Sequence, residues 1–294
     1  MSVQIAPNQV VAGKPVSPWL DFWRRLRRNR SAMIGLGILA ILIILAVFAV
    51  QIAPYKYWEN IRQDSWQPPS AKHWLGADEQ GRDILSRIIY GTRTSLLVGV
   101  ESVVISLLVG IIFGAMAGYY GGLIDSLIMR FMDIMLAFPA LLLAIAFMAV
   151  LGRGINNAII AIGIVSIPEY ARIVRGSVLS VKENEYVQAA RAIGDTDRQV
   201  ILHHVQPNVM SPIIVRATLG VSAAILEAAA LGFLGLGAQP PLAEWGAMLG
   251  SGRAAIFSAP HMVTFPGVAI TITVLSFNLL GDGLRDALDP RLKQ

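Results

Sequence analysis

Long stretches of this chain contain no charged residue at all. Residues 31–55, for example, include no Asp, Glu, Lys or Arg, and a helix needs about 20 apolar residues to cross a bilayer. Inside a bilayer the backbone must satisfy its own hydrogen bonds, which a helix does within a single segment. The sequence therefore predicts an all-α polytopic membrane protein.

The composition agrees with this class. The chain of 294 residues is 55% hydrophobic and 15% charged, with a mean hydropathy of +0.60. A soluble domain is about 45–50% apolar and about 25% charged, so a large soluble helical protein is disfavoured. The absence of cysteine excludes disulfides, thiolate catalysis and thiolate metal sites.

We divide the chain into a cytoplasmic tail (1–30), a first transmembrane helix (31–55), an extracytoplasmic loop (56–94) and a core of five further helices (95–294). The first helix is too long for the apolar region of a signal peptide. The six predicted spans are Ser31–Tyr55, Ser95–Ala117, Met132–Leu151, Asn157–Ile173, Ile213–Leu236 and Met262–Leu280.

The distribution of basic residues predicts the orientation of these spans. The predicted inner segments hold 15 of the 24 Lys and Arg residues and the predicted outer segments hold 8. Cytoplasmic segments of membrane proteins are enriched in these residues, so both termini are predicted in the cytoplasm. The net charge of +5 comes from residues beside apolar runs, and no aromatic-basic platform suggests nucleic-acid binding.

Small residues and prolines indicate how the spans pack. Gly110, Gly114 and Gly118 recur at four-residue spacing, which permits close helix contact. The fifth span has a similar Ala and Gly surface at residues 228–237, which either packs in the ordinary way or flexes during gating. Pro139 and Pro266 are expected to kink or break their helices.

The polar segment 180–208 carries the clearest local signals. Ser180 with Glu183, and Thr196 with Gln199, have the spacing of helix-starting capping boxes. Gly194 is placed to end the first helix, and a proline at 207 is expected to stop the second helix near residue 205. The pattern predicts two short helices joined at a glycine corner. A mere connector is the alternative.

Four charged residues lie inside predicted spans and are candidates for gating or for lining a path: Glu101, Asp133, Arg216 and Glu227. Structural pairing is the alternative for each. Arg216 and Glu227 are eleven residues apart and share a helix face, which we expect to point into the bundle. Asp133 is placed to pair with Arg130, three residues earlier.

Other functions find little support in the sequence. The adjacent His203 and His204 cannot ligate a metal as an i,i+4 pair would, and the other two histidines, His73 and His261, are predicted on the far side. An intramembrane enzyme would need a paired nucleophile and base in the bundle. An ion-driven transporter would need internal inverted repeats. The tryptophans at 58, 66 and 74 are expected to be interfacial anchors, and a docking site for a binding protein is the alternative.

The polar segment resembles the EAA loop of ATP-binding-cassette (ABC) importer permeases, whose pattern is E-A-A-x3-G-x9-I-x-L-P. Ala189, Ala190, Gly194 and Pro207 match this pattern, whereas Gln188, His204 and Gln206 stand in place of its Glu, Ile and Leu. In that family the loop forms the coupling helix that fits a cleft on the ATPase subunit. Gln188 replaces the family's Glu, so Glu185, almost one turn earlier, is the candidate substitute for its ionic contact. The two alanines leave room for close docking.

A second set of motifs narrows the resemblance. Residues 75–87 resemble the L-G-T-D-x-x-G-R-D-x-x-S-R signature of dipeptide/oligopeptide permeases of the second ("C") type, with Ala77 in place of Thr. Residues 91–96, 138–139, 244–249 and 278–290 also look like that group. Together the similar blocks span about residues 20–294.

The resemblance implies a type I ABC importer permease fold with six transmembrane helices and a cytoplasmic coupling helix. It implies these ATPase-coupling residues: Glu185, Gln188, Ala189, Ala190, Gly194 and Pro207. The implied partners are a homologous second permease subunit, two cytoplasmic ABC ATPase subunits and an extracytoplasmic substrate-binding protein, in the lipid of a bacterial inner membrane. No cofactor is expected here, because the chain lacks a G-x4-G-K-[ST] motif, and ATP and Mg²⁺ would bind the ATPase subunits. Di- or oligopeptides are the expected cargo, with glutathione or nickel complexes as alternatives.

Overall fold

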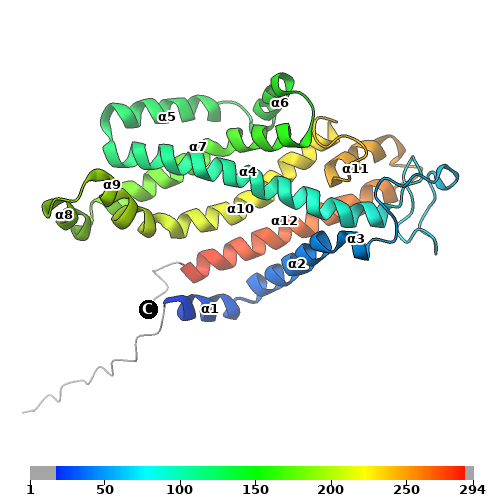
Figure 1. Cartoon of the computed structure of the whole chain (residues 1–294), viewed down its shortest axis with the longest axis horizontal. Coiled ribbons are helices and arrows are strands. Elements are labelled where there is room, and N and C mark those ends of the chain that lie inside the picture. Colours follow the sequence, from blue (N-terminus) through cyan, green and yellow to red (C-terminus); the bar gives the residue numbers. More distant parts are fainter. Residues whose placement is uncertain (1–17, 289–294) are drawn as a thin grey trace, which may run out of the picture.

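The computed structural model describes residues 18–288, so the tail up to residue 17 and the end of the last motif lie outside the described residues. The described part is an elongated helical bundle (Figure 1). Its helices are α1 (Pro18–Arg28), α2 (Arg30–Val47), α3 (Ala49–Ile52), α4 (Ile84–Tyr120), α5 (Gly122–Leu136), α6 (Ala140–Leu151), α7 (Ile155–Lys182), α8 (Glu185–Ala192), α9 (Asp197–Gln199), α10 (Gln206–Phe233), α11 (Trp245–Gly252) and α12 (His261–Leu288).

Five helical stretches are long and apolar enough to cross a membrane: α2, α4, α7, the stretch Asp197–Phe233 and α12. A sixth span arises if α5 and α6, which are bent by 92° relative to each other, are counted as one. This agrees with the six predicted spans. Pro139 stands at the bend, as predicted, whereas α12 continues unbroken through Pro266. Of the two expectations for Pro266, a kink or a break, the break was wrong, and Pro266 removes only the one backbone bond that its own N–H would have donated.

The centre of the bundle is the contact between α4 and α7, which the glycines make possible. A Cβ atom at Gly110 would lie 2.5 Å from the Cβ of Tyr170, and one at Gly114 would lie 2.5 Å from the carbonyl oxygen of Ala171. Gly118 faces Arg175 in the same way, at 2.9 Å. The backbones are therefore too close for any side chain at these three positions, as the four-residue spacing predicted.

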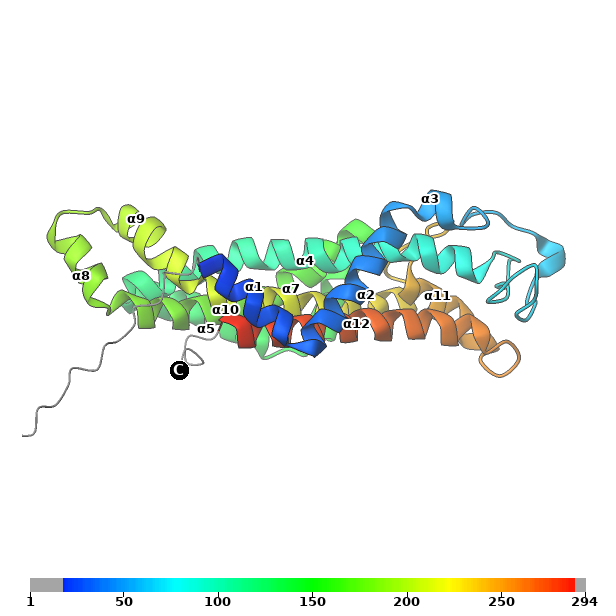
Figure 2. The same cartoon turned by 90° about the horizontal axis from the view of Figure 1, so that it is seen from below.

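The remaining long helices enclose this pair. α10 packs against α4, α7 and α12, while α2 packs against α12. Figure 2 shows α1 and α2 along the side of α12. Apolar side chains such as Ile162, Ile225 and Leu231 fill the interior.

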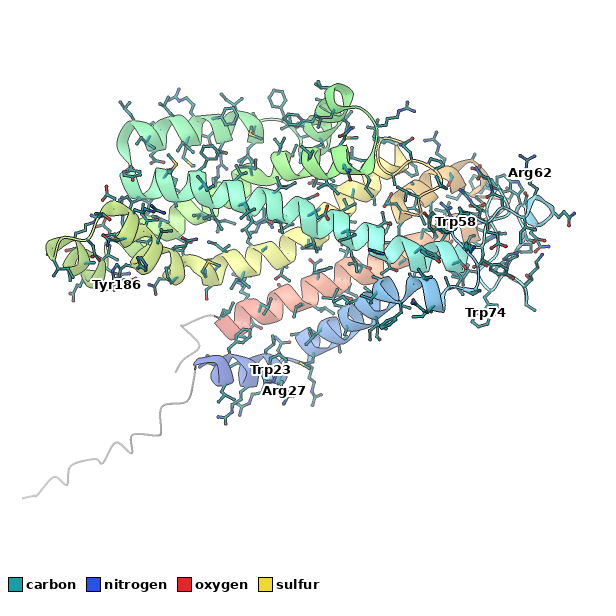
Figure 3. All side chains as sticks on the ribbon, in the orientation of Figure 1. Trp23, Arg27, Trp58, Arg62, Trp74 and Tyr186 are labelled. Carbon is teal, nitrogen blue, oxygen red and sulfur yellow. The ribbon has the colours of Figure 1, made fainter. Side chains whose placement is uncertain are left out.

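The bundle has two different ends (Figure 1). One carries α8 and α9, and we call residues 183–205 there the elbow. The opposite end carries the segment between α3 and α4 together with α11, and we call it the loop end. Trp58 and Trp74 lie at the loop end and Tyr186 at the elbow (Figure 3), so the two polar regions are separated by the length of the spans.

Candidate functional site

The elbow begins where α7 ends. α7 continues through Ser180 to Lys182, and α8 starts at Glu185 after Asn184, whose side chain makes no capping hydrogen bond. The predicted capping box of Ser180 and Glu183 was therefore wrong. Val174 and Val178 of α7 are buried in the elbow's own apolar cluster, and this packing extends α7 past the local start signal.

The corner and the second capping box are as predicted. Gly194 has φ +99° and an open space where a Cβ would point, so a backbone conformation that disfavours side chains forms the turn. The hydroxyl of Thr196 accepts from the Gln199 amide, and the Thr196 amide donates to the Gln199 side chain at 2.9 Å. The glycine and the box together fix the angle between α8 and α9.

The second helix of the elbow does not stop near residue 205. It passes through a π-helical turn (Val200–Val205) and continues as α10, with Pro207 in its first turn. The predicted stop was wrong because a proline is tolerated at the start of a helix, where its missing N–H costs little. The π-helical turn lets the chain restart the α-helical pattern there. As a result the elbow is continuous with a membrane span.

Contacts to α4 hold the elbow in place. The hydroxyl of Tyr119 donates to a carboxylate oxygen of Asp197 at 2.6 Å, and the guanidinium of Arg191 lies 4.9 Å from the Tyr119 ring centroid. Lys182 donates to the carbonyl of Gly118 at 3.0 Å. These contacts attach the elbow to the end of the α4–α7 pair.

The outer surface of the elbow is partly apolar. Ile193 is 83% exposed and Tyr186 is 43% exposed; Figure 3 shows Tyr186 at this end of the molecule. The predicted coupling residues Glu185, Gln188, Ala189, Gly194 and Pro207 are also exposed. Ala190, in contrast, is only 4% exposed and packs inside the elbow's apolar cluster. One of the two alanines therefore supports the elbow from within.

The charged residues of α10 face the bundle interior, as expected. Arg216 forms an ion pair with Glu169 of α7, a partner that the sequence reading missed. One carboxylate oxygen of Glu227 and the hydroxyl of Tyr170 are buried without a hydrogen-bond partner. Arg216, Glu227 and Tyr170 line the same small cavity of about 80 Å³. The interior therefore contains a buried carboxylate oxygen with unmet hydrogen-bonding capacity.

Glu227 is expected to matter for the transport cycle rather than for the fold. Replacing Glu227 with Gln keeps the size of the side chain but removes its negative charge. One oxygen of that carboxylate is buried without a hydrogen-bond partner. We expect Glu227→Gln to accumulate in the membrane at the wild-type level and to show reduced uptake. Normal uptake at wild-type abundance would remove Glu227 from the mechanism.

The other two charged candidates have different surroundings. Asp133 accepts from Arg172 of α7 at 2.6 Å, so its partner is on another helix and the expected pair with Arg130 was wrong. Asp125 and Arg175 make a second link between α5 and α7 at 2.5 Å. Glu101 lies exposed on α4 and lines a cavity at the loop end.

The loop end contains a buried polar cluster that sequence reasoning did not find. Asp83 caps α4 by accepting from the Ser86 amide at 2.7 Å, and it also lies 2.8 Å from Nδ1 of His73. The other ring nitrogen of His73 lies 3.2 Å from Asp64. Asp78 accepts from Nε of Arg82 at 2.7 Å. The conspicuous D-x-x-G-R-D run was the available signal, and it serves to fold this loop.

Acidification is expected to loosen this cluster. The hydrogen bond from Lys72 and then that from His73 lower the pKa of Asp64 below its ordinary 3.8. A carboxyl group with a lowered folded-state pKa stabilises the fold above its unfolded pKa, and the stabilisation is lost as the pH falls through the folded value. The protection of the amides of residues 62–83 against hydrogen exchange, taken relative to the intrinsic exchange rate at each pH, should therefore fall below about pH 4. In an Asp64→Asn variant this protection should already be reduced at pH 7, and unchanged protection there would contradict the role of Asp64.

A second buried carboxylate organises α11. Glu244 caps this helix by accepting from the amides of Gly246 at 2.7 Å and Ala247 at 2.8 Å. Burial raises the pKa of Glu244, against the opposing effect of these amides. Trp245 beside it is fully buried and donates from its ring nitrogen to the carbonyl of Ile88. This cap connects the start of α4 to the end of α10, where Gly232 packs against Glu244.

Among the described residues, no group of three or more His, Cys, Asp or Glu side chains is arranged to hold a metal ion. The aspartates at the loop end contact opposite sides of His73 instead of converging on one point. The charged side chains described above therefore cap helices, form ion pairs or line a cavity. Membrane spans around a charged interior, with a rigid helical elbow at one end, define a polytopic membrane permease fold.

Comparison with known proteins identifies the family. The model for the binding-protein-dependent transport system inner membrane component matches residues 110–294, and that for the N-terminal TM domain of oligopeptide transport permease C matches residues 17–69. The chain belongs to this family and is a permease subunit of an ABC importer, in the group that includes dipeptide and glutathione permeases. In this family the permease is a transport subunit, and ATP hydrolysis lies in separate chains.

Individual relatives are similar over nearly the whole chain. The dipeptide transport system permease protein DppC of Alkalihalophilus pseudofirmus is 52% identical over 95% of this chain and 91% of its own length. The glutathione transport system permease protein GsiD of Escherichia coli is 50% identical over 98% and 94%. Among solved structures, the MetNI methionine ABC transporter in inward-facing conformations has a TM-score of 0.58 at 18% identity, over 69% of this chain and 96% of that one. The last likeness concerns the fold.

Proposed function

We propose that this chain forms half of the path of an importer for di- or oligopeptides. The second half would be a homologous permease subunit, and a substrate-binding protein would deliver cargo at the loop end. The 52% identity to a dipeptide permease over most of the chain supports this cargo. Glutathione is the second candidate, supported by the 50% identity to glutathione permeases, and nickel complexes remain the third.

The observation that carries the mechanism is the elbow's construction. Its outer surface exposes the large apolar side chains of Tyr186, Ile193 and Leu202, and exposed apolar patches mark protein contacts. One of the two ATPase subunits, which would hold ATP and Mg²⁺, would dock there. In this proposal Glu185, Gln188 and Ala189 form the contact surface.

The remaining coupling residues would shape the elbow. Ala190 packs within it, Gly194 makes its corner and Pro207 starts the span that follows. We place the elbow and both termini in the cytoplasm, because the basic residues favour that side. The division into a tail (1–30), a first span (31–55), an outer loop (56–94) and a core (95–294) follows from that orientation.

Three of the intramembrane charges fit a path-lining or gating role. Arg216 and Glu227 line the interior cavity, and Glu101 lines the cavity at the loop end. Asp133 differs, because its pair with Arg172 supports a structural role.

Co-purification followed by reconstitution tests this proposal. The chain, expressed with its neighbouring transport genes, should bring a second permease and ATPase subunits with it. In proteoliposomes the complex should import a dipeptide only with ATP and the binding protein. Uptake by this chain alone would contradict the proposed function. A complex that imports glutathione but no dipeptide would contradict the proposed cargo.

A further inference from the structure

A cavity of about 790 Å³ lies at the loop end. It lies between the segment that follows α3, the outer turns of α4 and the first turns of α7. Small-molecule sites commonly have volumes of about 300–1,000 Å³. The side chains used below are Lys56, Glu59, Tyr90, Arg93, Leu97 and Glu101.

Two charges in this cavity have no partner in the part of the chain that the structure describes. Neither Arg93 nor Glu101 makes a hydrogen bond or an ion pair there, whereas Arg172 and Arg175 are both paired with aspartates. Glu101 is also the one charged residue between Arg93 and Asp125 in the sequence. A charge inside an apolar span is costly unless it serves a function. This applies to Glu101, whereas Arg93 lies in the outer segment just before the span, and both charges are free to pair with a ligand.

The two charges are arranged along one helix face. Tyr90, Arg93, Leu97 and Glu101 recur at intervals of three and four residues, so all four project from the same side of α4. Arg93 and Glu101 are eight residues apart, which is about 12 Å along the axis. Leu97 provides an apolar surface between them and is 46% exposed. The face therefore presents a cation, an apolar patch and an anion in that order.

A short peptide has the complementary pattern. It carries an ammonium group at one end, a carboxylate at the other and side chains between them. An extended residue spans at most about 3.6 Å, so two or three residues fit between side chains whose backbones are about 12 Å apart. The rim of the cavity adds Lys56 and Glu59, so that the four charges cancel and a net-neutral ligand is favoured.

We propose that this cavity is a subsite for short zwitterionic peptides on the import path. Arg93 binds the terminal carboxylate, Glu101 binds the terminal ammonium, and Leu97 contacts the peptide between its ends. This inference rests on the proposed import function and adds to it the site and charge pattern that select the cargo in the membrane.

The lack of native cysteine permits a direct test. In the reconstituted complex with its binding protein, Leu97→Cys should react with a charged thiosulfonate reagent, and saturating dialanine should slow labelling of this chain about tenfold. Phe257→Cys is the matched control, because Phe257 is 99% exposed and lies outside the cavity lining. Dialanine should not slow its labelling. Equal labelling of Leu97→Cys with and without dialanine would overturn the proposal.

Charge-removing variants give an independent readout. Arg93→Gln and Glu101→Gln should each lower dialanine uptake per ATP hydrolysed about tenfold, since a hydrogen bond to a charged group is lost. The exposed residues Arg62 and Glu79 do not line this cavity, so Arg62→Gln and Glu79→Gln should behave as wild type.

The outcomes separate the two levels of the proposal. Wild-type uptake with unaffected cavity variants would overturn the subsite alone. Failure of the cavity variants to assemble with the second permease would assign the two charges to that interface and also overturn the subsite. If the assembled wild-type complex imports no peptide, the proposed function fails first and the subsite fails with it.

Discussion

A Gly194→Val variant is expected to hydrolyse ATP while importing little substrate. Gly194 has φ +99°, and a β-branched residue in such a conformation costs about 1–3 kcal/mol. The space around its Cβ position is open, so the strain acts on the backbone of the corner and not on packing. Relaxing that strain would change the angle between α8 and α9. Uptake and ATPase activity of the same reconstituted complex should show the loss of coupling.

Gly176→Val is the matched control for this prediction. Gly176 is exposed in α7, has open space around it and has ordinary helical backbone. The same substitution there adds a β-branched side chain without a positive φ. Equal ratios of uptake to hydrolysis in the two variants would contradict a specific role for the corner.

The Gly114→Leu substitution is expected to leave little assembled protein in the membrane. Its Cβ would lie 2.5 Å from the carbonyl oxygen of Ala171 and 2.7 Å from the Cβ of Val174, so α4 and α7 would have to separate. Overpacking commonly costs about 1–3 kcal/mol, and here much of the contact sits on rigid backbone. Membrane abundance and the unfolding temperature in detergent should both fall sharply.

Gly37→Leu adds the same side chain where nothing lies within 4 Å of the Cβ position. It should therefore leave abundance and unfolding temperature unchanged. A Gly114→Leu protein as abundant and as stable as this control would show that the α4–α7 contact can open without cost, and the packing argument would fail.

The sequence allowed the spans, the glycine contact and the corner to be predicted because each depends on local information. Apolar length decides whether a segment can cross a bilayer. The four-residue spacing of Gly110, Gly114 and Gly118 places all three on one helix face, and Gly194 stands directly after the predicted first helix of the elbow. The family resemblance depended likewise on contiguous motifs.

The errors arose where distant contacts override local signals. The Ser180 box failed because buried valines extend α7 along the elbow. The pairs of Arg216 with Glu169 and of Asp133 with Arg172 join different helices, and spacing within one helix cannot reveal such partners. The Asp64–His73–Asp83 cluster requires the loop to fold back on itself. For the same reason the cavity around Glu101 could not be read from the sequence.

The continuity of the elbow with its span has a mechanical consequence. α10 follows the elbow without a break and has 28 residues, so it is about 42 Å long, and its far tip is seated against Glu244 at the loop end. A tilt of about 5° around the midpoint of such a rod displaces each tip by roughly 2 Å in opposite directions. In the proposed mechanism, a displacement of the elbow at one membrane face would therefore also move the far end of α10, so that both ends of the path would change together.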